Sequence, residues 1–198
     1  EEGTHKVICE HSTIGMVAPT HGTIGEIPRS AYEEAEERVV RELRAIGKPF
    51  AVILNSAHPS SPEATALGHE LEAKYGVPVA LVSCPELDAD DIREILSMIL
   101  DEFPVTEVSV RLPDWIAALA PDHRIRASVE ATVRECAAAA DKAGDIAAAY
   151  SGLSENEYLG EVRIDSIDLG TGCATVSAEA ADGLFYTVLG EASGLEIK

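Results

Sequence analysis

Hydrophobic and polar positions follow two alternating periodicities in the first half of the chain. Mostly apolar runs of strand length lie at residues 12–20, 49–55 and 77–83, and the second is uninterrupted up to Asn55. After each run, apolar residues recur every three or four positions, over residues 30–46, 61–75 and 88–103. Such runs indicate strands buried on both faces, and the second spacing indicates amphipathic helices. The pattern predicts strand–helix units that build a parallel α/β sheet with helices on both faces.

Residues with capping or breaking chemistry stand at the ends of these helical segments. We expect the helices to begin at Ser30, at Ser60 or Ser61 before Pro62, and at Asp88. Ser30 has Glu33 three residues later, which is the spacing of a capping box, and Asp88 has Asp91. Gly47, Gly76 and Pro104 are expected to end the helices. Three parallel strands leave an exposed sheet edge, so we also expect further strands outside this chain.

The pattern changes after Pro104. Residues 105–112 alternate between apolar and polar, as in a strand with one wet face. An alanine-rich stretch, 124–150, predicts a long helix broken at Gly144, and the sole tryptophan, Trp115, is interpreted as a core anchor. Two strands, a helix and a closing strand are expected at 161–169, 173–179, 182–193 and 195–198, with a hairpin turn at Gly170-Thr171-Gly172. We therefore predict two domains, 1–104 and an α+β domain over 105–198.

Composition limits the classes of partner. Apolar residues make up 46% and charged residues 25% of the chain, as in a globular protein with a core. Acidic residues outnumber basic ones 35 to 15, for a formal charge of −20, which repels nucleic acid and anionic lipid. The longest basic cluster, residues 123–126, is interpreted as a solvated helix start. We predict no nucleic-acid partner and no direct membrane insertion.

Cysteine and histidine are scattered. Cys9, Cys84, Cys136 and Cys173 form no C-x-x-C pair, and the sequence contains neither a signal peptide nor an apolar run of membrane length. This pattern predicts reduced thiols in a cytoplasmic protein. The six histidines show no ligand spacing, so no metal site is predicted in this chain.

Polar loops follow each predicted strand of the first half. They are Thr20-His21-Gly22-Thr23, Asn55-Ser56-Ala57-His58 and Ser83-Cys84-Pro85. Ligands of open α/β sheets bind beyond the carboxyl ends of the strands, so the loops are expected on one rim. Each loop, taken alone, is also compatible with an ordinary structural turn.

A series of sequence blocks, read in order, resembles one known family. The blocks are HSTIG from His11, GTIGEIPR from Gly22, YEEAEER from Tyr32, GKPF from Gly47, Asn55-Ser56, YGVPV from Tyr75, EFPV from Glu102, Leu112-Pro113 with Trp115, and GLEI from Gly194. The whole chain thus resembles the stage IV sporulation protein A family of spore-coat morphogenetic ATPases. The similarity is dense from about residue 5 to 115 and sparser afterwards.

The resemblance implies a P-loop protein of the translation-factor-related GTPase class that uses ATP and Mg²⁺. It implies that residues 1–104 are the C-terminal half of the ATPase domain and 105–198 the middle domain, with the P-loop region and a C-terminal domain outside this chain. Hydrolysis in that family drives self-assembly into the basement layer of the spore coat. The implied place is the mother-cell cytoplasm at the outer forespore membrane. The implied partners are further copies, coat proteins and a forespore-membrane anchor protein.

The resemblance also assigns a role to the Asn55 loop. GTPases of this class read guanine with N-K-x-D, and this chain has Asn55, Ser56, Ala57 and His58 there. Without the Asp, guanine loses a charged acceptor, a loss of about 1.5–3 kcal/mol, so ATP becomes a reasonable ligand. Asn55, Ser56 and His58, with Ser83 and Cys84 from the next loop, are predicted to lie near the base. His21 stands where the family commonly has Asp, and its role stays open.

Phosphate-binding motifs do not occur in the sequence. There is no G-x-x-x-x-G-K-[ST] and no Asp-x-x-Gly in a magnesium-binding context. We predict no catalytic residue in these 198 residues, which alone should neither bind ATP tightly nor hydrolyse it. The alternative is a non-catalytic assembly module of the coat scaffold. A third interpretation, an unrelated α/β or receiver-like domain, lacks the acidic cluster and lysine that a receiver needs.

Overall fold

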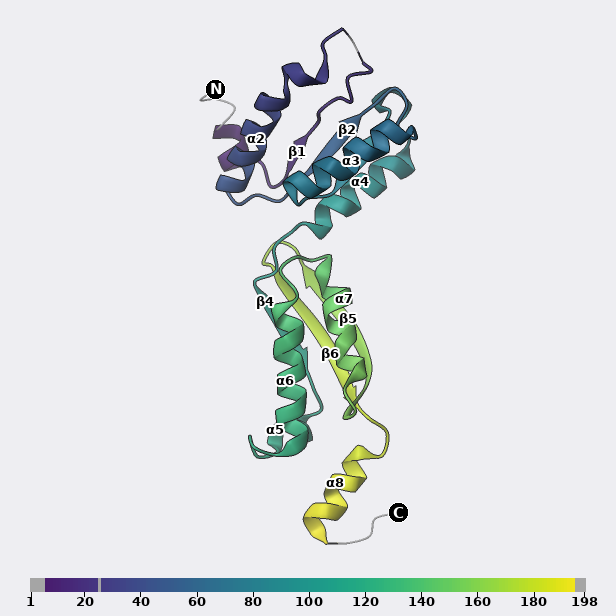
Figure 1. Ribbon diagram of the computed structural model, residues 1–198. Helices are drawn as coiled ribbons and strands as arrows, with labels where there is room; N and C mark the ends of the chain where they lie inside the picture. The colour runs from purple at the N-terminus through teal and green to yellow at the C-terminus, as the bar shows by residue number, and fades with distance from the viewer. Residues whose placement is uncertain (1–5, 25, 195–198) are drawn as a thin grey trace. The chain divides into compact units, whose positions relative to one another are not determined.

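The computed structural model describes residues 6–24 and 26–194 and divides into two compact units, 1–102 and 103–198. Figure 1 shows the elements of each unit. The closing strand predicted at 195–198 lies outside the described residues. A short π-helical turn at Val7–His11 precedes the first strand.

The first unit contains the predicted parallel sheet. Strands β1 (Gly15–Val17), β2 (Phe50–Asn55) and β3 (Val79–Val82) pair in the order β1-β2-β3, with β2 in the centre. Val17 pairs with Val52, and Asn55 pairs with Val82, both in parallel register. The first strand is shorter than the predicted run, because Pro19 has no N–H to continue the ladder. An isolated parallel bridge from Thr20 to Asn55 follows it.

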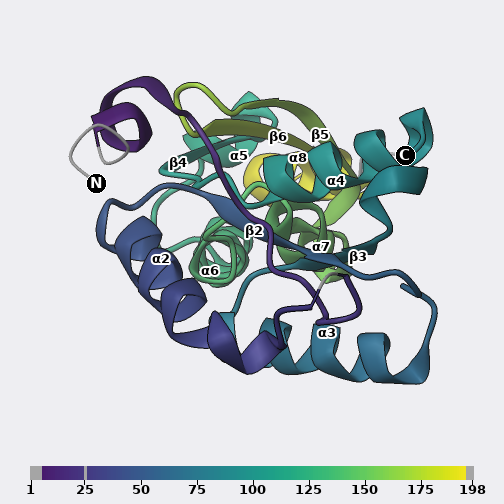
Figure 2. The same ribbon diagram turned by 90° about the horizontal axis from the view of Figure 1, so that it is seen from above.

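Helices cover both faces of this sheet, as the pattern predicted. Figure 2 shows α2 (Glu33–Ala45) and α3 (Pro62–Tyr75) on one side of the strands and α4 (Ala89–Asp101) on the other. Val40 and Leu71 are buried in the cluster beneath α2 and α3. Ile95 and Ile99 of α4 pack in a separate cluster on the opposite face.

Two of the predicted helix starts are confirmed and one is wrong. Ser61 caps α3 by accepting the N–H of Ala64, and Asp88 forms a capping box with Asp91 at α4. The capping box predicted at Ser30 does not form. Residues Arg29–Ala31 make a 3-10 turn instead, and α2 begins after Tyr32 with no side-chain cap. The turn is held by Arg29, which donates to Thr20 and Glu36.

The second unit contains a mixed sheet. Strands β5 (Leu159–Asp168) and β6 (Cys173–Ala180) form the predicted antiparallel hairpin, and Gly172 in its turn has φ +71°. Strand β4 (Glu107–Arg111) pairs in parallel with the other edge of β6, which the sequence pattern did not predict. The exposed and half-buried residues of β4 alternate, so its predicted wet face is confirmed.

The alanine-rich stretch forms two helices, α6 (Arg124–Ala138) and α7 (Asp145–Ser151), and the break starts before the predicted Gly144. Segment 139–144 leaves helical geometry because its backbone pairs elsewhere. Val105 N–H donates to Asp141 C=O, and Ala143 N–H donates to Phe103 C=O. Hydrogen bonds to another segment therefore compete with the helix at this point.

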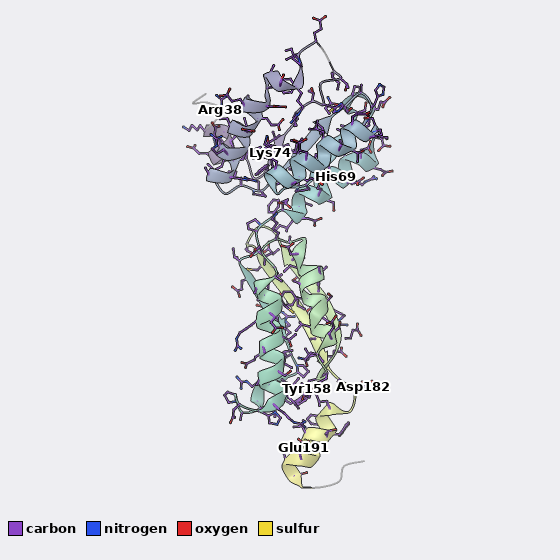
Figure 3. The ribbon with its side chains drawn as sticks, viewed as in Figure 1. Arg38, His69, Lys74, Tyr158, Asp182 and Glu191 are labelled. Atoms are coloured by element: carbon purple, nitrogen blue, oxygen red, sulfur yellow. The ribbon has the colours of Figure 1, made fainter. Side chains whose placement is uncertain are left out.

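The remaining helices close the core of the second unit. Trp115 of α5 (Asp114–Ala118) packs against the core and contacts Phe185 of α8 (Leu184–Ser193) edge-to-face at 5.7 Å, which confirms it as a core anchor. Arg124 forms an ion pair of 2.8 Å with Glu191, labelled in Figure 3, and links α6 to α8. Within the described ranges, the structure has no helix with the length and apolar character needed to span a bilayer.

Candidate functional site

The first two polar loops meet at the carboxyl end of the parallel sheet. Asn55 N–H donates to Pro19 C=O at 2.9 Å, and His21 N–H donates to Asn55 C=O at 2.9 Å. Further out, Ala57 N–H donates to Thr23 Oγ1 at 3.1 Å. The loops at 20–23 and 55–58 therefore share one rim, as predicted from the strand order.

The third loop is joined to the same rim by the side chain of Asn55. Its Oδ1 accepts the N–H of Cys84 at 3.0 Å, at the start of the 3-10 turn Cys84–Glu86. Ser56 N–H donates to Val82 C=O at 2.9 Å, just before Ser83. We call the residues 20–23, 55–58 and 83–85 the rim.

The predicted base-proximal residues differ in exposure. His58 and Cys84 are exposed, Asn55 and Ser83 are half-buried, and Ser56 is fully buried. Ser56 Oγ accepts the N–H of His58 at 3.1 Å, so this hydroxyl shapes the loop from inside. A planar ligand at the rim would meet backbone groups together with the His58 and Cys84 side chains.

His21 turns back toward the protein. Its Nδ1 is buried and has no hydrogen-bond partner among the described residues. The following Gly22 has φ +91°, a backbone conformation that residues with a Cβ rarely adopt. Gly22 N–H donates to Thr20 Oγ1 at 3.1 Å, which closes the turn.

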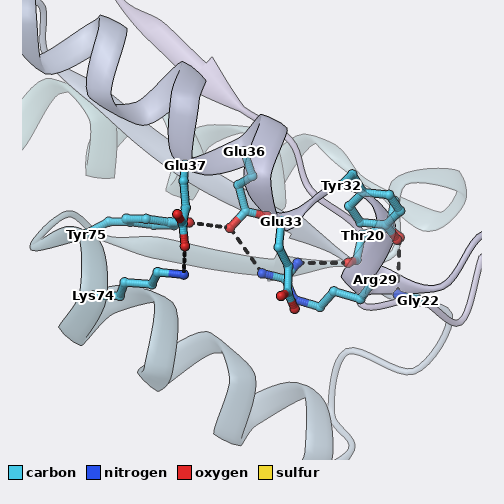
Figure 4. Close-up of polar contacts among 9 residues, drawn as sticks. All are labelled: Thr20, Gly22, Arg29, Tyr32, Glu33, Glu36, Glu37, Lys74 and Tyr75. Carbon is cyan, nitrogen blue, oxygen red and sulfur yellow. Dashed lines mark hydrogen bonds and ion pairs between the residues drawn. The ribbon is translucent and has the colours of Figure 1, made fainter.

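A polar cluster beneath the rim, shown in Figure 4, was missed at the sequence level. Glu36 is 6% exposed, and its Oε1 accepts from Arg29 Nη2 at 3.1 Å and from Tyr75 Oη at 2.8 Å. Arg29 Nη1 also donates to Thr20 C=O at 3.2 Å, and the Thr20 hydroxyl bonds to that of Tyr32. The sequence does indicate that Glu36 is buried, because Glu36 stands four residues from both Tyr32 and Val40, on the core face of the helix.

Burial changes the acidity of Tyr75. Loss of solvent around its hydroxyl, and then its hydrogen bond to Glu36, raise the pKa of Tyr75 to about 12. At neutral pH the phenol therefore stays protonated, and its O–H donates a hydrogen bond to Glu36. Glu37, the next residue of α2, pairs with Lys74, whose hydrogen bond lowers the pKa of the Glu37 carboxyl.

Comparison with known proteins decides the family. Residues 1–104 match the ATPase domain of stage IV sporulation protein A, and residues 105–198 match its middle domain. This chain belongs to the stage IV sporulation protein A family. It is 41% identical, over all 198 residues, to the stage IV sporulation protein A of Clostridioides difficile (strain 630), of Bacillus subtilis (strain 168) and of Bacillus anthracis. It spans 40% of the length of each of these curated relatives, and no solved structure matches it.

The rim lies wholly in the part that matches the ATPase domain of the stage IV sporulation protein A family. An ATPase domain implies that the family's full-length proteins use a nucleotide. Across the described ranges there is no group of three or more His, Cys, Asp or Glu side chains placed to hold a metal ion. The rim offers peptide N–H and C=O groups, an imidazole and a thiol, which suit the edge of a heterocyclic base.

Proposed function

We propose that this chain supplies the base-binding side of the ATP site in a longer sporulation ATPase. The observation that supports this most strongly is the hydrogen bond from Cys84 N–H to Asn55 Oδ1. It fixes two loops side by side at the carboxyl end of parallel strands, where open α/β sheets bind ligands. The predicted base-proximal residues thus lie together in the region that matches an ATPase domain.

The preference for adenine follows from what the Asn55 loop lacks. Guanine needs an acceptor for its ring N–H and exocyclic amine, and His58 stands where GTP-binding relatives place a carboxylate. An unpaired polar group in a binding site costs about 1–3 kcal/mol, so guanine is disfavoured by that amount. Adenine presents one amine, which a peptide carbonyl of the rim can accept.

The remaining chemistry is assigned to the longer protein. We propose a P-loop GTPase-like sheet that this unit completes, with the phosphate- and Mg²⁺-binding groups outside residues 1–198. Catalysis of phosphoryl transfer consists mainly of positioning and charge stabilisation by those groups. Hydrolysis then drives assembly of copies of the protein, with coat proteins and a membrane anchor, into the spore-coat basement layer in the mother-cell cytoplasm.

Photo-crosslinking of the longer protein with 8-azido-ATP tests the proposal. We expect covalent adducts within residues 55–58 or 83–86, and excess ATP should abolish them. Adducts confined to residues 105–198, or labelling that ATP does not displace, would contradict the proposed site. A lack of adducts in residues 1–104, with assembly intact, would favour the alternative of a non-catalytic assembly module.

A further inference from the structure

One face of the mixed sheet in the second unit is polar and open. Figure 2 shows α6 and α7 on one side of the strands β4, β6 and β5. Val108 of β4 and Val176 of β6 point to that side and belong to the core. The residues between them point to the opposite side, where those of β4 are exposed and most of those of the central strand β6 are half-buried. We call this opposite side the polar face.

Two arginines lie in one row across the polar face. Arg111 of β4 and Arg163 of β5 both pair in register with Ser177 of β6. Asp165, at the irregularity of β5, accepts a hydrogen bond from Ser177 Oγ, and its Oδ2 lies 3.9 Å from Arg111 Nη1. The Arg163 side chain has no ion-pair or hydrogen-bond partner among the described residues. This arginine row therefore holds two positive charges and one negative charge.

The next row across the polar face consists of three hydroxyl residues. Ser109 of β4 and Ser166 of β5 both pair in register with Thr175 of β6. The row lies two residues, or about 7 Å, from the arginine row along the strands. Its side chains are short, so another surface can approach closely, and each hydroxyl can both donate and accept a hydrogen bond.

The third row is acidic. Glu107 of β4 and Asp168 of β5 both pair in register with Cys173 of β6. Hydrogen bonds from Thr171 and Gly170 lower the pKa of the Asp168 carboxyl, so it is charged at neutral pH. The Glu107 side chain has no ion-pair or hydrogen-bond partner among the described residues. The charge of the polar face thus changes sign over four residues, or about 14 Å, along the strands.

We propose that the polar face binds the same face of a second copy of the protein, about a two-fold axis that runs along the hydroxyl row. Arg111 then lies opposite Glu107 of the other copy, and Arg163 lies opposite Asp168. By symmetry each of these ion pairs forms twice, and Thr175 meets its own equivalent at the centre. The inference rests on the proposed function, in which copies of the protein assemble, and it names a surface through which they do so.

The order of the charges selects a second copy as the occupant. A polyanion would be repelled by the acidic row, and a cationic partner by the two arginines. A covering helix of the same polypeptide would need apolar side chains beneath it, and the three rows are charged or carry hydroxyls apart from Cys173. A second copy presents both signs in the reverse order once it is turned about the axis, so the two faces are complementary row by row.

The choice of axis follows from the same charges. An axis along the arginine row would set each arginine against its own equivalent, and an axis along the acidic row would do the same with the carboxylates. Of the three rows, only the hydroxyl row as axis brings opposite charges together. The three rows are also close to charge balance, since two arginines and three carboxylates leave −1, against −20 for the whole chain.

The size of the polar face indicates a contact that acts together with others. Three strands about 4.8 Å apart and five residues of about 3.4 Å cover roughly 250 Å². A stable interface between two proteins buries about 800 Å² on each partner. The contact is therefore weak in an isolated pair of copies, and its effect is to be measured on the assembly of the longer protein.

Charge reversal in the longer protein tests the ion pairs, with sedimentation in the presence of ATP as the measure of assembly. We expect Arg111→Glu and Glu107→Arg each to raise the concentration needed for assembly at least about tenfold, because symmetry introduces each repulsion twice. The two changes combined in one chain should restore assembly to within about threefold of the wild type, because the opposite charges then face each other again.

Arg134→Glu on α6 is the matched control. The side chains of Arg134 and Arg111 are both 73% exposed, and the two substitutions change the net charge equally. Arg134→Glu should leave assembly unchanged, and an effect as large as that of Arg111→Glu would overturn the inference. So would the absence of an effect from either single reversal at the polar face, or a double variant that assembles no better than the single ones.

Crosslinking at the axis tests the geometry. We expect a short bismaleimide to join Thr175→Cys chains into dimers in the assembled protein. The wild type should give few dimers, since Cys173 lies four residues along the strand from its own equivalent. Ala147→Cys, exposed on α7, controls for a thiol on the other side of the sheet. No dimers from Thr175→Cys, or equal yields from the three proteins, would overturn the inference.

The outcomes separate this inference from the proposed nucleotide site. Labelling of the rim by 8-azido-ATP, together with assembly that neither reversal changes, would overturn the inference and leave the nucleotide site standing. Restored assembly in the double variant, without labelling of the rim, would support the polar face and contradict the nucleotide site alone.

Discussion

Asn55 joins three loops with one backbone unit and one side chain. Its N–H and C=O bond to residues 19 and 21, and its Oδ1 holds the N–H of Cys84. The sequence indicated that Asn55 stands at the end of a buried strand, because apolar runs and their polar ends are local features. It could not indicate the bond to Cys84, because that contact depends on the register between β2 and β3.

His58→Asp should move the nucleotide preference toward guanine. The new carboxylate would accept from the ring N–H and amine of guanine, and a charged hydrogen bond of about 1.5–3 kcal/mol corresponds to roughly a 10–100-fold gain in GTP affinity relative to ATP. Competition binding on the longer protein measures the ratio. His69→Asp, an exposed site on α3, is the matched control and should leave it unchanged. An unchanged ratio in His58→Asp would place the base elsewhere.

Tyr75 should titrate well above an ordinary tyrosine. Its pKa is raised from 10.0 to about 12, so it contributes stability that is fully present below about pH 10 and is lost as the pH rises through about 12. The difference in tyrosinate absorbance between wild type and Tyr75→Phe isolates this group during an alkaline titration. A midpoint near pH 10 in the folded protein would show that the phenol is neither buried nor held by Glu36.

At the level of elements, the spacing of apolar residues predicted which segments form helices and strands. It predicted less well where those helices begin and end. Strand β2 and helices α3 and α4 follow the pattern because burial and local capping agree there. The start of α2 and the break after α6 were misplaced. In both cases a partner distant in sequence decides the backbone, through Arg29 at Thr20 and through Phe103 at Ala143.

The left-handed end of α3 should be costly to replace. Gly76 has φ +55°, and a Cβ there would meet no atom within 4 Å, so the cost of Gly76→Ala is backbone strain alone. We expect a loss of about 1–2 kcal/mol in the free energy of unfolding, measured with urea. Gly76→Asn should lose less, because Asn adopts this conformation more readily. Equal losses in the two variants would point to a cause other than φ.

For the molecule as a whole, each unit has a core of its own. The buried cluster of the second unit draws only on residues between Ile116 and Val188. Residues 103–198 should therefore unfold in one cooperative urea transition, with a slope of roughly 1 kcal/mol per molar, followed through the fluorescence of Trp115. A gradual change in fluorescence without a transition would show that this core is insufficient alone.

The whole chain also shows where sequence reasoning ends. The three polar loops could be assigned to one rim, since parallel strands place their carboxyl ends together. The contacts of Glu36 could not be predicted, because Arg29 and Tyr75, which both donate to its Oε1, are brought to it by the fold from other parts of the chain. The parallel pairing of β4 with β6 also depends on contacts distant in sequence.

The affinity of the longer protein for ATP, measured for Asn55→Ala, tests the central claim most directly. Removing Oδ1 frees the Cys84 loop, and we expect the Kd for ATP to rise about tenfold, which corresponds to about 1.4 kcal/mol. Asn156→Ala is the control, since Asn156 also makes several hydrogen bonds, to Ser128 and Thr132, but lies in the second unit. Its Kd should match that of the wild type. An unchanged Kd in Asn55→Ala, with the protein folded, would contradict a nucleotide site at this rim.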